Sequence, residues 1–456
     1  MKTNILKMKK FGQHINSNLI LGLISILFIF STCDHPPKDL KSALEKIPGV
    51  TVNVMESDSM YSESYELWFT QPVDHNNPKS ETFQQRVLLS HVGYDRPTVV
   101  ILEGYSIFTD KPGELSKLFN ANQITIEHRF FANSRPDSIP WSYLTIKQAA
   151  DDQHEVIQTL KKIYKQKWIS TGISKGGQTT IYHRRFYPDD VDVSVPYVAP
   201  LNFSEEDSRV YTFLNNVGTK ECREKIYNYQ ISLFENKEKL MPMVEQVVQQ
   251  KNYTFTMGLD RAYDLSVLEF PFAFWQWCGN CNDIPDKNSS IDELLKEYLA
   301  VNPLSFFDEK ETNNTLPFFY QALTEIGMYG YEIDPFTNYL KDTTNITFEF
   351  TMPYGVNTTF NPESMKDINN WVQNEGNYML YIYGENDAWS STAVEPSGKT
   401  IAVKMVNPGG CHETRISSFP DDMQESIYKL LESWLDVQIK RKPRSGGHAD
   451  IMLEVL

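Results

Sequence analysis

The 456-residue sequence predicts an α/β protein, in which a mainly parallel sheet is covered by helices and interrupted by one helical insertion. Strand and helix patterns alternate between residues 98 and 198. This alternation stops after Pro200, and helical periodicity dominates as far as residue 374. A strand returns at 378–383, and an amphipathic helix at 421–435 follows it.

Two stretches before the alternating region predict antiparallel strands. Apolar and polar residues alternate at 65–69 and at 85–92. Pro72, Asn77 and Pro78 supply turn chemistry between them. We therefore expect these two strands to precede the parallel part of the sheet.

The alternating region contains the expected core of the sheet. Short β-branched runs predict its strands, and apolar residues at spacings near three and four predict its helices. The strands are expected at residues 98–102, 123–127, 168–171 and 193–198, and the helices at 146–163 and 176–186. This order is typical of a parallel sheet with helices on both faces.

One strand-to-helix junction carries a G-x-S-x-G motif, centred on Ser174. The pattern is short, but a nucleophile elbow requires it at the end of a strand and the start of a helix. Glycines at 172 and 176 remove side chains that would clash in so sharp a turn. The motif predicts that Ser174 is a nucleophile in an α/β-hydrolase fold with an inserted, mainly helical cap. The alternative is a Gly/Ser loop before an ordinary helix.

The catalytic base is expected to be His412. In α/β-hydrolases the order along the chain is serine, acid, histidine. Of the nine histidines, only His183, His412 and His448 follow Ser174. His183 lies in the helix that leaves the elbow, and His448 lies in a basic tail. His412 lies on a loop just before the last helix, although a plain surface-loop histidine is the alternative.

The acid should follow a late strand, and Asp387 follows the strand at 378–383. It would hold the tautomer of His412 and stabilise the imidazolium. Glu385 is the competing acid. Backbone N–H groups of Lys175, and of Gly104 or Tyr105 after an early strand, are expected to form the oxyanion hole.

The N-terminal segment has the layout of a secretory signal. Four lysines between residues 2 and 10 precede an apolar run at 19–30, and small residues lead to Cys33. Cys33 predicts a bacterial lipoprotein, in which this cysteine is acylated; a simple cleaved signal or an uncleaved anchor is the alternative. We expect export to the cell envelope, on the outer surface or in the periplasm, or secretion.

The net charge of the chain is −16, and residues 1–32 contain four lysines and no acid. An exported chain without them is more acidic still. Such a chain repels nucleic acid, so no nucleic-acid partner is expected.

Four cysteines remain beyond Cys33: Cys222, Cys278, Cys281 and Cys411. Export permits disulfides, and four cysteines allow three connectivities. We expect structural pairing of these residues. Redox chemistry is disfavoured because the CxxC follows an aromatic stretch, and zinc is disfavoured because no second ligand pair accompanies it. No metal and no cofactor are expected.

The predicted organisation has five parts. They are a signal peptide at 1–32, a first hydrolase segment at 36–202, a helical cap at 203–374, a second hydrolase segment at 375–440 and a tail at 441–456. We expect no membrane contact except through the lipid anchor.

With these residues placed, the sequence resembles the clan of prolyl carboxypeptidase and dipeptidyl peptidase II. The shared segments are EHRFF at 127–131, WSYLT at 141–145, QAAD at 148–151 and the Ser174 elbow. Segments in the cap and directly before it resemble the secreted bacterial serine tripeptidyl aminopeptidases of the prolyl tri/tetrapeptidyl type. These are VAPL at 198–201, VGT at 217–219, EFPFAFWQ at 269–276 and QALTEIG at 321–327.

The resemblance implies a helical cap over an α/β-hydrolase and release of tripeptides from free N-termini of peptides, often after proline. One departure is Asp387-Ala388-Trp389, where these relatives usually have Asp-Pro-Trp. This departure leaves the expected triad unchanged and alters the residue next to Trp389 in the expected wall of the pocket.

An exopeptidase must bind a free ammonium group, for which a carboxylate in the cap is the physical means. The candidates are Glu205, Glu206, Asp207, Glu269 and Glu325. Each has the alternative of an ordinary solvated or paired acid. Trp275, Phe274 and Trp389 are candidates for an apolar slot that takes proline, with core packing as their alternative.

Two rival functions use the same residues. The same triad serves a cell-surface esterase or lipase, which would accept substrates with blocked amines. An inactive lipoprotein that binds peptides in the groove under the cap is the rival outside enzymes. Labelling by a fluorophosphonate separates this rival from any active hydrolase.

Overall fold

The structure is a computed structural model that describes residues 36–77, 79–344, 346–353 and 355–441. The predicted signal segment, the candidate lipidation site Cys33, His448 and most of the predicted tail lie outside these residues. All elements described below belong to the unit formed by residues 38–456.

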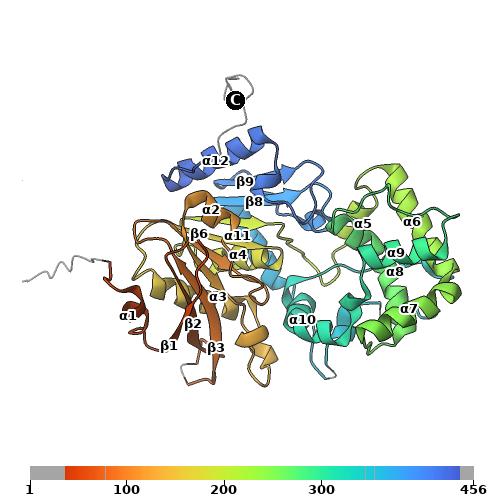
Figure 1. Ribbon diagram of the computed structural model, residues 1–456, viewed down its shortest axis with the longest axis horizontal. Coiled ribbons are helices and arrows are strands. Elements are labelled where there is room, and N and C mark those ends of the chain that lie inside the picture. Colours follow the sequence, from red (N-terminus) through yellow and green to blue (C-terminus); the bar gives the residue numbers. More distant parts are fainter. Residues whose placement is uncertain (1–35, 78, 345, 354, 442–456) are drawn as a thin grey trace, which may run out of the picture. The chain divides into compact units, whose positions relative to one another are not determined.

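A nine-stranded mixed sheet forms the centre of this unit (Figure 1). Its strand order is β1-β2-β3-β5-β4-β6-β7-β8-β9. Strands β1 to β3 pair antiparallel, β3 also pairs antiparallel with β5, and every later pairing is parallel. The strands are β1 (Val50–Met55), β2 (Glu63–Pro72), β3 (Thr82–His91), β4 (Thr98–Leu102), β5 (Asn122–Ile126), β6 (Trp168–Ile173), β7 (Val193–Tyr197), β8 (Met379–Gly384) and β9 (Ala402–Asn407).

The sequence analysis missed both edge strands, β1 and β9. Most residues of β1 and β9 are only half-buried or exposed. An edge strand with so little burial lacks the apolar pattern by which inner strands are recognised. The inner strands were predicted within a few residues of their ends.

Helices cover both faces of the sheet, as predicted. Along β4, Val100 faces a cluster that contains Val156 and Leu160, whereas Val99 faces a cluster that contains Leu115 and Leu431. Neighbouring strand residues point to opposite faces, so these clusters are the two covered sides. The helices of this part are α1 (Leu40–Leu44), α2 (Glu114–Phe119), α3 (Ile146–Leu160), α4 (Lys175–Phe186) and α12 (Asp421–Leu435).

The long insertion between β7 and β8 is helical, as predicted. Among its described residues the only strand-like pairing is the isolated bridge between Glu206 and Met328. Its α-helices are α5 (Arg209–Leu214), α6 (Lys220–Glu235), α7 (Lys237–Lys251), α8 (Leu259–Gln276), α9 (Ile291–Val301), α10 (Glu309–Gln321) and α11 (Glu363–Asn374). In Figure 1 the green helices α5 to α9 form a group of their own.

The last of these helices, α11, lies on the hydrolase part. The Tyr182 hydroxyl of α4 lies 3.4 Å from the sulfur of Met365, and Arg185 pairs with Asp367 at 3.0 Å. Strands β7 and β8 are direct neighbours in the sheet, with Ser194 opposite Met379. The whole insertion is therefore a single excursion between adjacent strands. Within the described ranges, no helix is long and apolar enough to span a membrane.

The four cysteines beyond Cys33 form two disulfides, Cys222–Cys281 and Cys278–Cys411. The expectation of structural pairing is confirmed. The two cysteines of the CxxC do not bond to each other, because each pairs with a distant partner. One of the bonds joins the insertion to the last part of the hydrolase.

Candidate active site

Ser174 occupies a strained turn between β6 and α4. Its backbone angles are φ 57° and ψ −122°, a region that residues with a side chain rarely adopt. The Ser174 N–H donates to the Tyr197 carbonyl at 2.9 Å. A Cβ at Gly172 would collide with the Gly176 carbonyl, so the strand and the helix approach too closely for any residue but glycine there. The local sequence therefore encodes this turn.

Asp387 and His412 meet beyond the end of β8. The fully buried Asp387 begins the short 3₁₀ segment η7 (Ala388–Thr392), where its Oδ1 accepts from the Trp389 N–H at 3.1 Å. Its Oδ2 lies 2.8 Å from Nδ1 of His412, which is also buried. A carboxylate bonded at Nδ1 leaves Nε2 of the imidazole as the nitrogen for proton transfer.

The competing residues take other roles. Glu385 accepts from the Gly409 N–H at 2.7 Å, within the turn next to β9. His183, within α4, bonds at 3.0 Å to Asp190, which follows that helix. Within the described chain neither residue forms a side-chain hydrogen bond or ion pair with His412 or Asp387.

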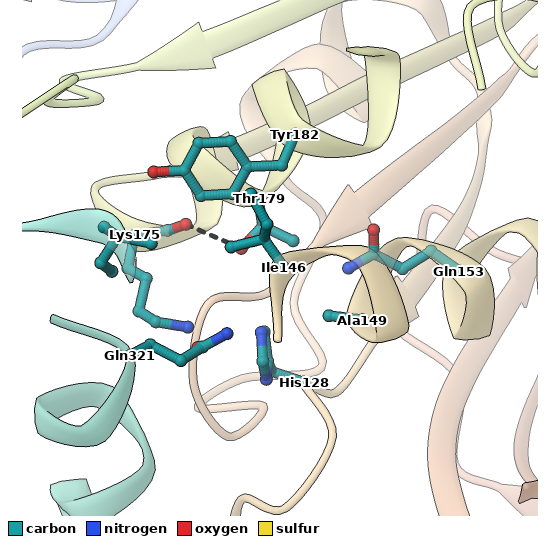
Figure 2. A pocket seen from close by; sticks show the side chains of 9 residues that line it. His128, Ile146, Ala149, Gln153, Lys175, Thr179, Tyr182 and Gln321 are labelled. Atoms are coloured by element: carbon teal, nitrogen blue, oxygen red, sulfur yellow. Dashed lines mark hydrogen bonds between the residues drawn. The ribbon is translucent and has the colours of Figure 1, made fainter. Parts of the chain in front are cut away.

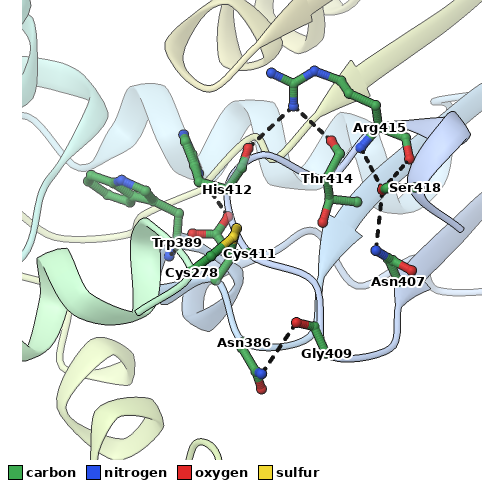
Figure 3. Close-up of a disulfide and its surroundings, with 11 residues drawn as sticks. Cys278, Asn386, Trp389, Asn407, Gly409, Cys411, His412, Thr414, Arg415 and Ser418 are labelled. Atoms are coloured by element: carbon green, nitrogen blue, oxygen red, sulfur yellow. Dashed lines mark hydrogen bonds and ion pairs between the residues drawn. A yellow bond between two sulfur atoms is a disulfide. The ribbon is translucent and has the colours of Figure 1, made fainter. Parts of the chain in front are cut away.

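His412 is held by the cap as well as by the hydrolase part (Figure 3). Its N–H donates to the Gln276 carbonyl at the end of α8, at 3.0 Å. The indole of Trp277 stands edge-on to its imidazole, with ring centres 5.8 Å apart. The preceding residue, Cys411, carries the disulfide to Cys278. The end of α8 and the residues after it therefore hold His412 by a hydrogen bond and by ring packing, and they hold the neighbouring Cys411 by a disulfide.

The segment after β4 lies directly against the start of α4. A Cβ on Gly104 would come within 2.5 Å of the Lys175 carbonyl carbon. The N–H groups near Gly104 and that of Lys175 therefore lie on two backbone segments in contact beside Ser174. This is the arrangement that an oxyanion hole of two backbone donors requires.

The Tyr105 side chain is a feature that the sequence analysis missed. Burial raises the pKa of its phenol, and the nearby Ser174 side chain partly offsets this effect. Its ring contacts Phe131 and, from the cap, Phe318. The only signal in the sequence was an aromatic residue next to the expected oxyanion glycine.

His128 and Arg129 lie behind this segment. His128 is buried, and burial together with the positive charge of Lys175 holds its pKa well below the usual value. Arg129 forms a two-pronged pair with Asp152 at 2.7 and 2.9 Å, and both side chains are fully buried. Arg129 is therefore a buried partner of a carboxylate.

Trp389 belongs to an aromatic wall beside Asp387. The ring of Phe272 stacks on that of Tyr329 at 3.7 Å, and both rings stand edge-on to Trp389, at 5.0 and 5.3 Å. Trp275 lies apart from this group and packs tightly on Gly218. Phe274 is fully buried beside Trp275.

Glu269 lies behind the aromatic wall. The Tyr329 hydroxyl donates to its carboxyl at 2.8 and 3.0 Å. Burial raises the pKa of Glu269 to about 8, which makes a neutral carboxyl its main form at pH 7.

The other four candidate carboxylates differ in their partners. Asp207 pairs with Arg209 at 2.7 Å. Glu325 accepts from the Ile146 N–H at 2.8 Å and from the Ser364 hydroxyl at 3.1 Å, so it connects the cap to α3 and α11.

Glu205 and Glu206 have no basic side chain paired with them among the described residues. Glu206 accepts a hydrogen bond from Tyr211. Burial and the negative charges of Glu349 and Glu206 raise the pKa of Glu205.

A cavity of about 320 Å³ lies within the cap, between α5, α6, α8 and the segment after Met328. Its lining includes Tyr211, Phe272 and Gly330. Phe272 is also part of the aromatic wall, and Tyr211 is the partner of Glu206. The cavity therefore adjoins the wall and lies next to Glu206.

The comparison with known families decides the class of this site. The family described as PS-10 peptidase S37 matches residues 35–443. The chain belongs to this family. It is a serine peptidase with an α/β-hydrolase fold, and the resemblance inferred from its sequence is confirmed.

Relatives of this S37 peptidase carry matching names. The prolyl tri/tetrapeptidyl aminopeptidase of Streptomyces mobaraensis is 34% identical over 414 residues, which cover 88% of this chain and 86% of that protein. A probable serine protease of Arabidopsis thaliana, EDA2, is 27% identical over 42% of this chain and 43% of its own length. Among solved structures, the proline iminopeptidase of Mycobacterium smegmatis has 13% identity over 80% of this chain and 98% of its own, with a TM-score of 0.42. This last likeness carries no argument about function.

Proposed function

We propose that this S37 peptidase releases tripeptides from the free N-termini of peptides through an acyl-enzyme, with Ser174, His412 and Asp387 as the triad. The observation that carries the proposal is the contact of 2.8 Å between His412 and Asp387, in a chain whose serine occupies a strained elbow. The name of the 34% identical relative supports the choice of a tripeptide product.

In the proposed reaction, Ser174 Oγ attacks the scissile carbonyl and His412 takes the proton of the hydroxyl. Asp387 holds the Nδ1–H tautomer and stabilises the imidazolium. The N–H groups of Lys175 and of Gly104 or Tyr105 bind the oxyanion. His412 then gives its proton to the leaving amine, and the tripeptidyl group remains on Ser174 as an ester. Water, activated by His412, attacks this ester and releases the tripeptide.

We assign recognition of the free ammonium group to Glu205, together with its neighbour Glu206. Both lack a basic partner in the described chain, whereas Asp207 is paired with Arg209. Both carboxylate oxygens of Glu325 already accept hydrogen bonds, from the Ile146 N–H and from the Ser364 hydroxyl. Glu269, held neutral by burial, is a weaker attractor for a cation. The pKa of Glu205 is raised by burial and by the like charges of Glu349 and Glu206, and a bound ammonium group would neutralise this repulsion.

The preference for proline would come from the wall formed by Trp389, Phe272 and Tyr329. Flat aromatic faces suit a pyrrolidine ring, which has no N–H to satisfy. Trp275 is less suited to this role, because its ring packs on Gly218 inside the cap.

The test uses matched chromogenic substrates. A tripeptidyl-nitroanilide that ends in proline should be hydrolysed, and its N-acetylated form should not. Ser174→Ala should abolish turnover, and Glu205→Gln should raise KM for the free-amine substrate. Full activity of Ser174→Ala, or equal turnover of the acetylated compound, would overturn the proposal. The second result would favour an esterase-like hydrolase.

We also propose that the chain is exported and anchored through a lipid on Cys33. Pairing of all four later cysteines as disulfides supports an oxidising compartment. In cells that express the full chain, the enzyme should fractionate with membranes, and Cys33→Ala should release it in soluble form. A Cys33→Ala protein that stays with the membranes would contradict the lipid anchor.

A further inference from the structure

The Lys175 side chain has no role in the proposed reaction, yet it is buried next to the nucleophile. Its exposed fraction is 3%. Lysine is rarely buried to this degree without a partner, because its ammonium group loses water. Its position therefore calls for a specific contact.

That contact is the carbonyl of Gly104. Lys175 Nζ donates to this oxygen at 2.7 Å. The rings of Tyr105 and Phe131 flank the ammonium group at 5.7 and 5.3 Å, within the range of cation–π attraction. The negative charge of Glu325 opposes the effect of burial, which lowers the pKa of Lys175.

The Lys175 side chain also lines a small cavity (Figure 2). Its lining includes His128, Gln153 and Gln321. The side-chain oxygens of Gln153 and Gln321 are buried and accept no bond within the described chain. This setting favours a hydrogen-bond donor at Nζ.

The carbonyl that Lys175 contacts belongs to the peptide that joins Gly104 and Tyr105. In a trans peptide the C=O and the N–H point in opposite directions, and the described chain has no cis peptide. With the carbonyl held by Nζ, the Tyr105 N–H points away from the lysine. No acceptor within the described residues takes this N–H. It is thus free for the substrate oxyanion.

We propose that the Lys175 side chain is a positioning residue for the oxyanion hole, which it serves by orienting and polarising the Gly104–Tyr105 peptide. A donor on the carbonyl withdraws electrons from the peptide and strengthens its N–H as a donor. Lys175 then has two roles. Its backbone N–H donates to the oxyanion directly, and its Nζ strengthens the second donor, the Tyr105 N–H, through the Gly104 carbonyl. The inference rests on the proposed triad.

Lys175→Met tests the inference, because methionine keeps the unbranched stem of the side chain up to Cε and removes its donors. Loss of one direct oxyanion donor lowers kcat by about 10²- to 10³-fold. An indirect donor should matter less, so we expect a fall in kcat of about 10- to 100-fold, with KM little changed. Tyr182→Phe is the matched control, since it removes a buried hydroxyl from the same cavity and leaves Gly104 untouched.

Two inhibitors separate positioning from a merely structural role. A tripeptide aldehyde forms an adduct with Ser174 whose oxygen occupies the oxyanion hole, whereas the free tripeptide product does not. In Lys175→Met the affinity for the aldehyde should fall by the same factor as kcat, while the affinity for the tripeptide should stay. Lys175→Gln supplies the same comparison if the methionine variant does not fold.

The outcomes are distinct. Equal losses for the aldehyde and for the tripeptide, or no loss for either, would overturn the role of Lys175 and leave the triad standing. Absence of fluorophosphonate labelling at Ser174 in the wild type would instead overturn the proposed function itself.

Discussion

Removal of the Cys278–Cys411 disulfide should impair catalysis beyond its effect on stability. Cys411 precedes His412, and Cys278 follows the two residues of the cap that contact this histidine. The double variant Cys278→Ser/Cys411→Ser therefore frees the loop that positions the base. The control is Cys222→Ser/Cys281→Ser, which removes a bond inside the cap.

The two disulfides are expected to stabilise the protein by similar amounts, so the two variants can be compared directly. The chain entropy of the unfolded state gives each bond a similar stabilisation, about 5 kcal/mol for a separation of 133 residues and about 4 kcal/mol for 59. Both variants should thus lose comparable free energy of unfolding. A displacement of a catalytic group by about 1 Å costs up to 10²-fold in rate, so we expect a 10- to 100-fold lower kcat only in the variant beside His412.

The assay pairs kcat on the tripeptidyl substrate with urea unfolding, both at a temperature where each variant is folded. Dithiothreitol treatment of the wild type should reproduce the loss of activity, and the Cys278→Ser/Cys411→Ser variant should be insensitive to it. If the control variant lost as much kcat as the variant next to His412, the reasoning about the histidine loop would be refuted.

Two further predictions concern buried acids. The folded-state pKa of Glu269 is raised to about 8, so its contribution to stability is complete below about pH 4.5 and is lost as the pH rises through 8. The free energy of unfolding should therefore fall less between pH 5 and pH 8 in Glu269→Gln than in the wild type, by at most about 4 kcal/mol. Urea unfolding at a series of pH values measures this difference. An equal fall in both proteins would contradict the raised pKa of Glu269. Asp152→Ala leaves the buried guanidinium of Arg129 without its partner and should cost about 3–5 kcal/mol of stability, measured by urea unfolding. A cost below about 1 kcal/mol would show that this pair is dispensable.

The sequence was most informative where function is encoded locally. Five residues around Ser174 specify the elbow, since the close approach of strand and helix demands glycine at fixed positions. The choice of His412 and Asp387 followed from chain order, and the structure brings these two residues to 2.8 Å. Inner strands were predicted well because burial on both faces leaves a continuous apolar run.

Features that depend on the packing of distant segments could not be predicted from the sequence. The partner of each cysteine depends on how the cap folds, and three connectivities were equally open. The side chain of Tyr105 lies near Ser174 only because of the path of its loop. The five candidate acids could be ranked only once Arg209, Tyr329 and Ser364 were seen beside three of them.

The excursion between β7 and β8 has a consequence for how the enzyme acquires activity during synthesis. Ser174 precedes the excursion, whereas Asp387 and His412 follow it, so no N-terminal fragment that ends before His412 holds all three residues of the proposed triad. Pairing of strands so far apart in sequence is slow to form, because a long loop must close first. Proteolytic activity is thus a late event of folding, and in refolding experiments it should return with the slowest phase rather than with the first appearance of secondary structure.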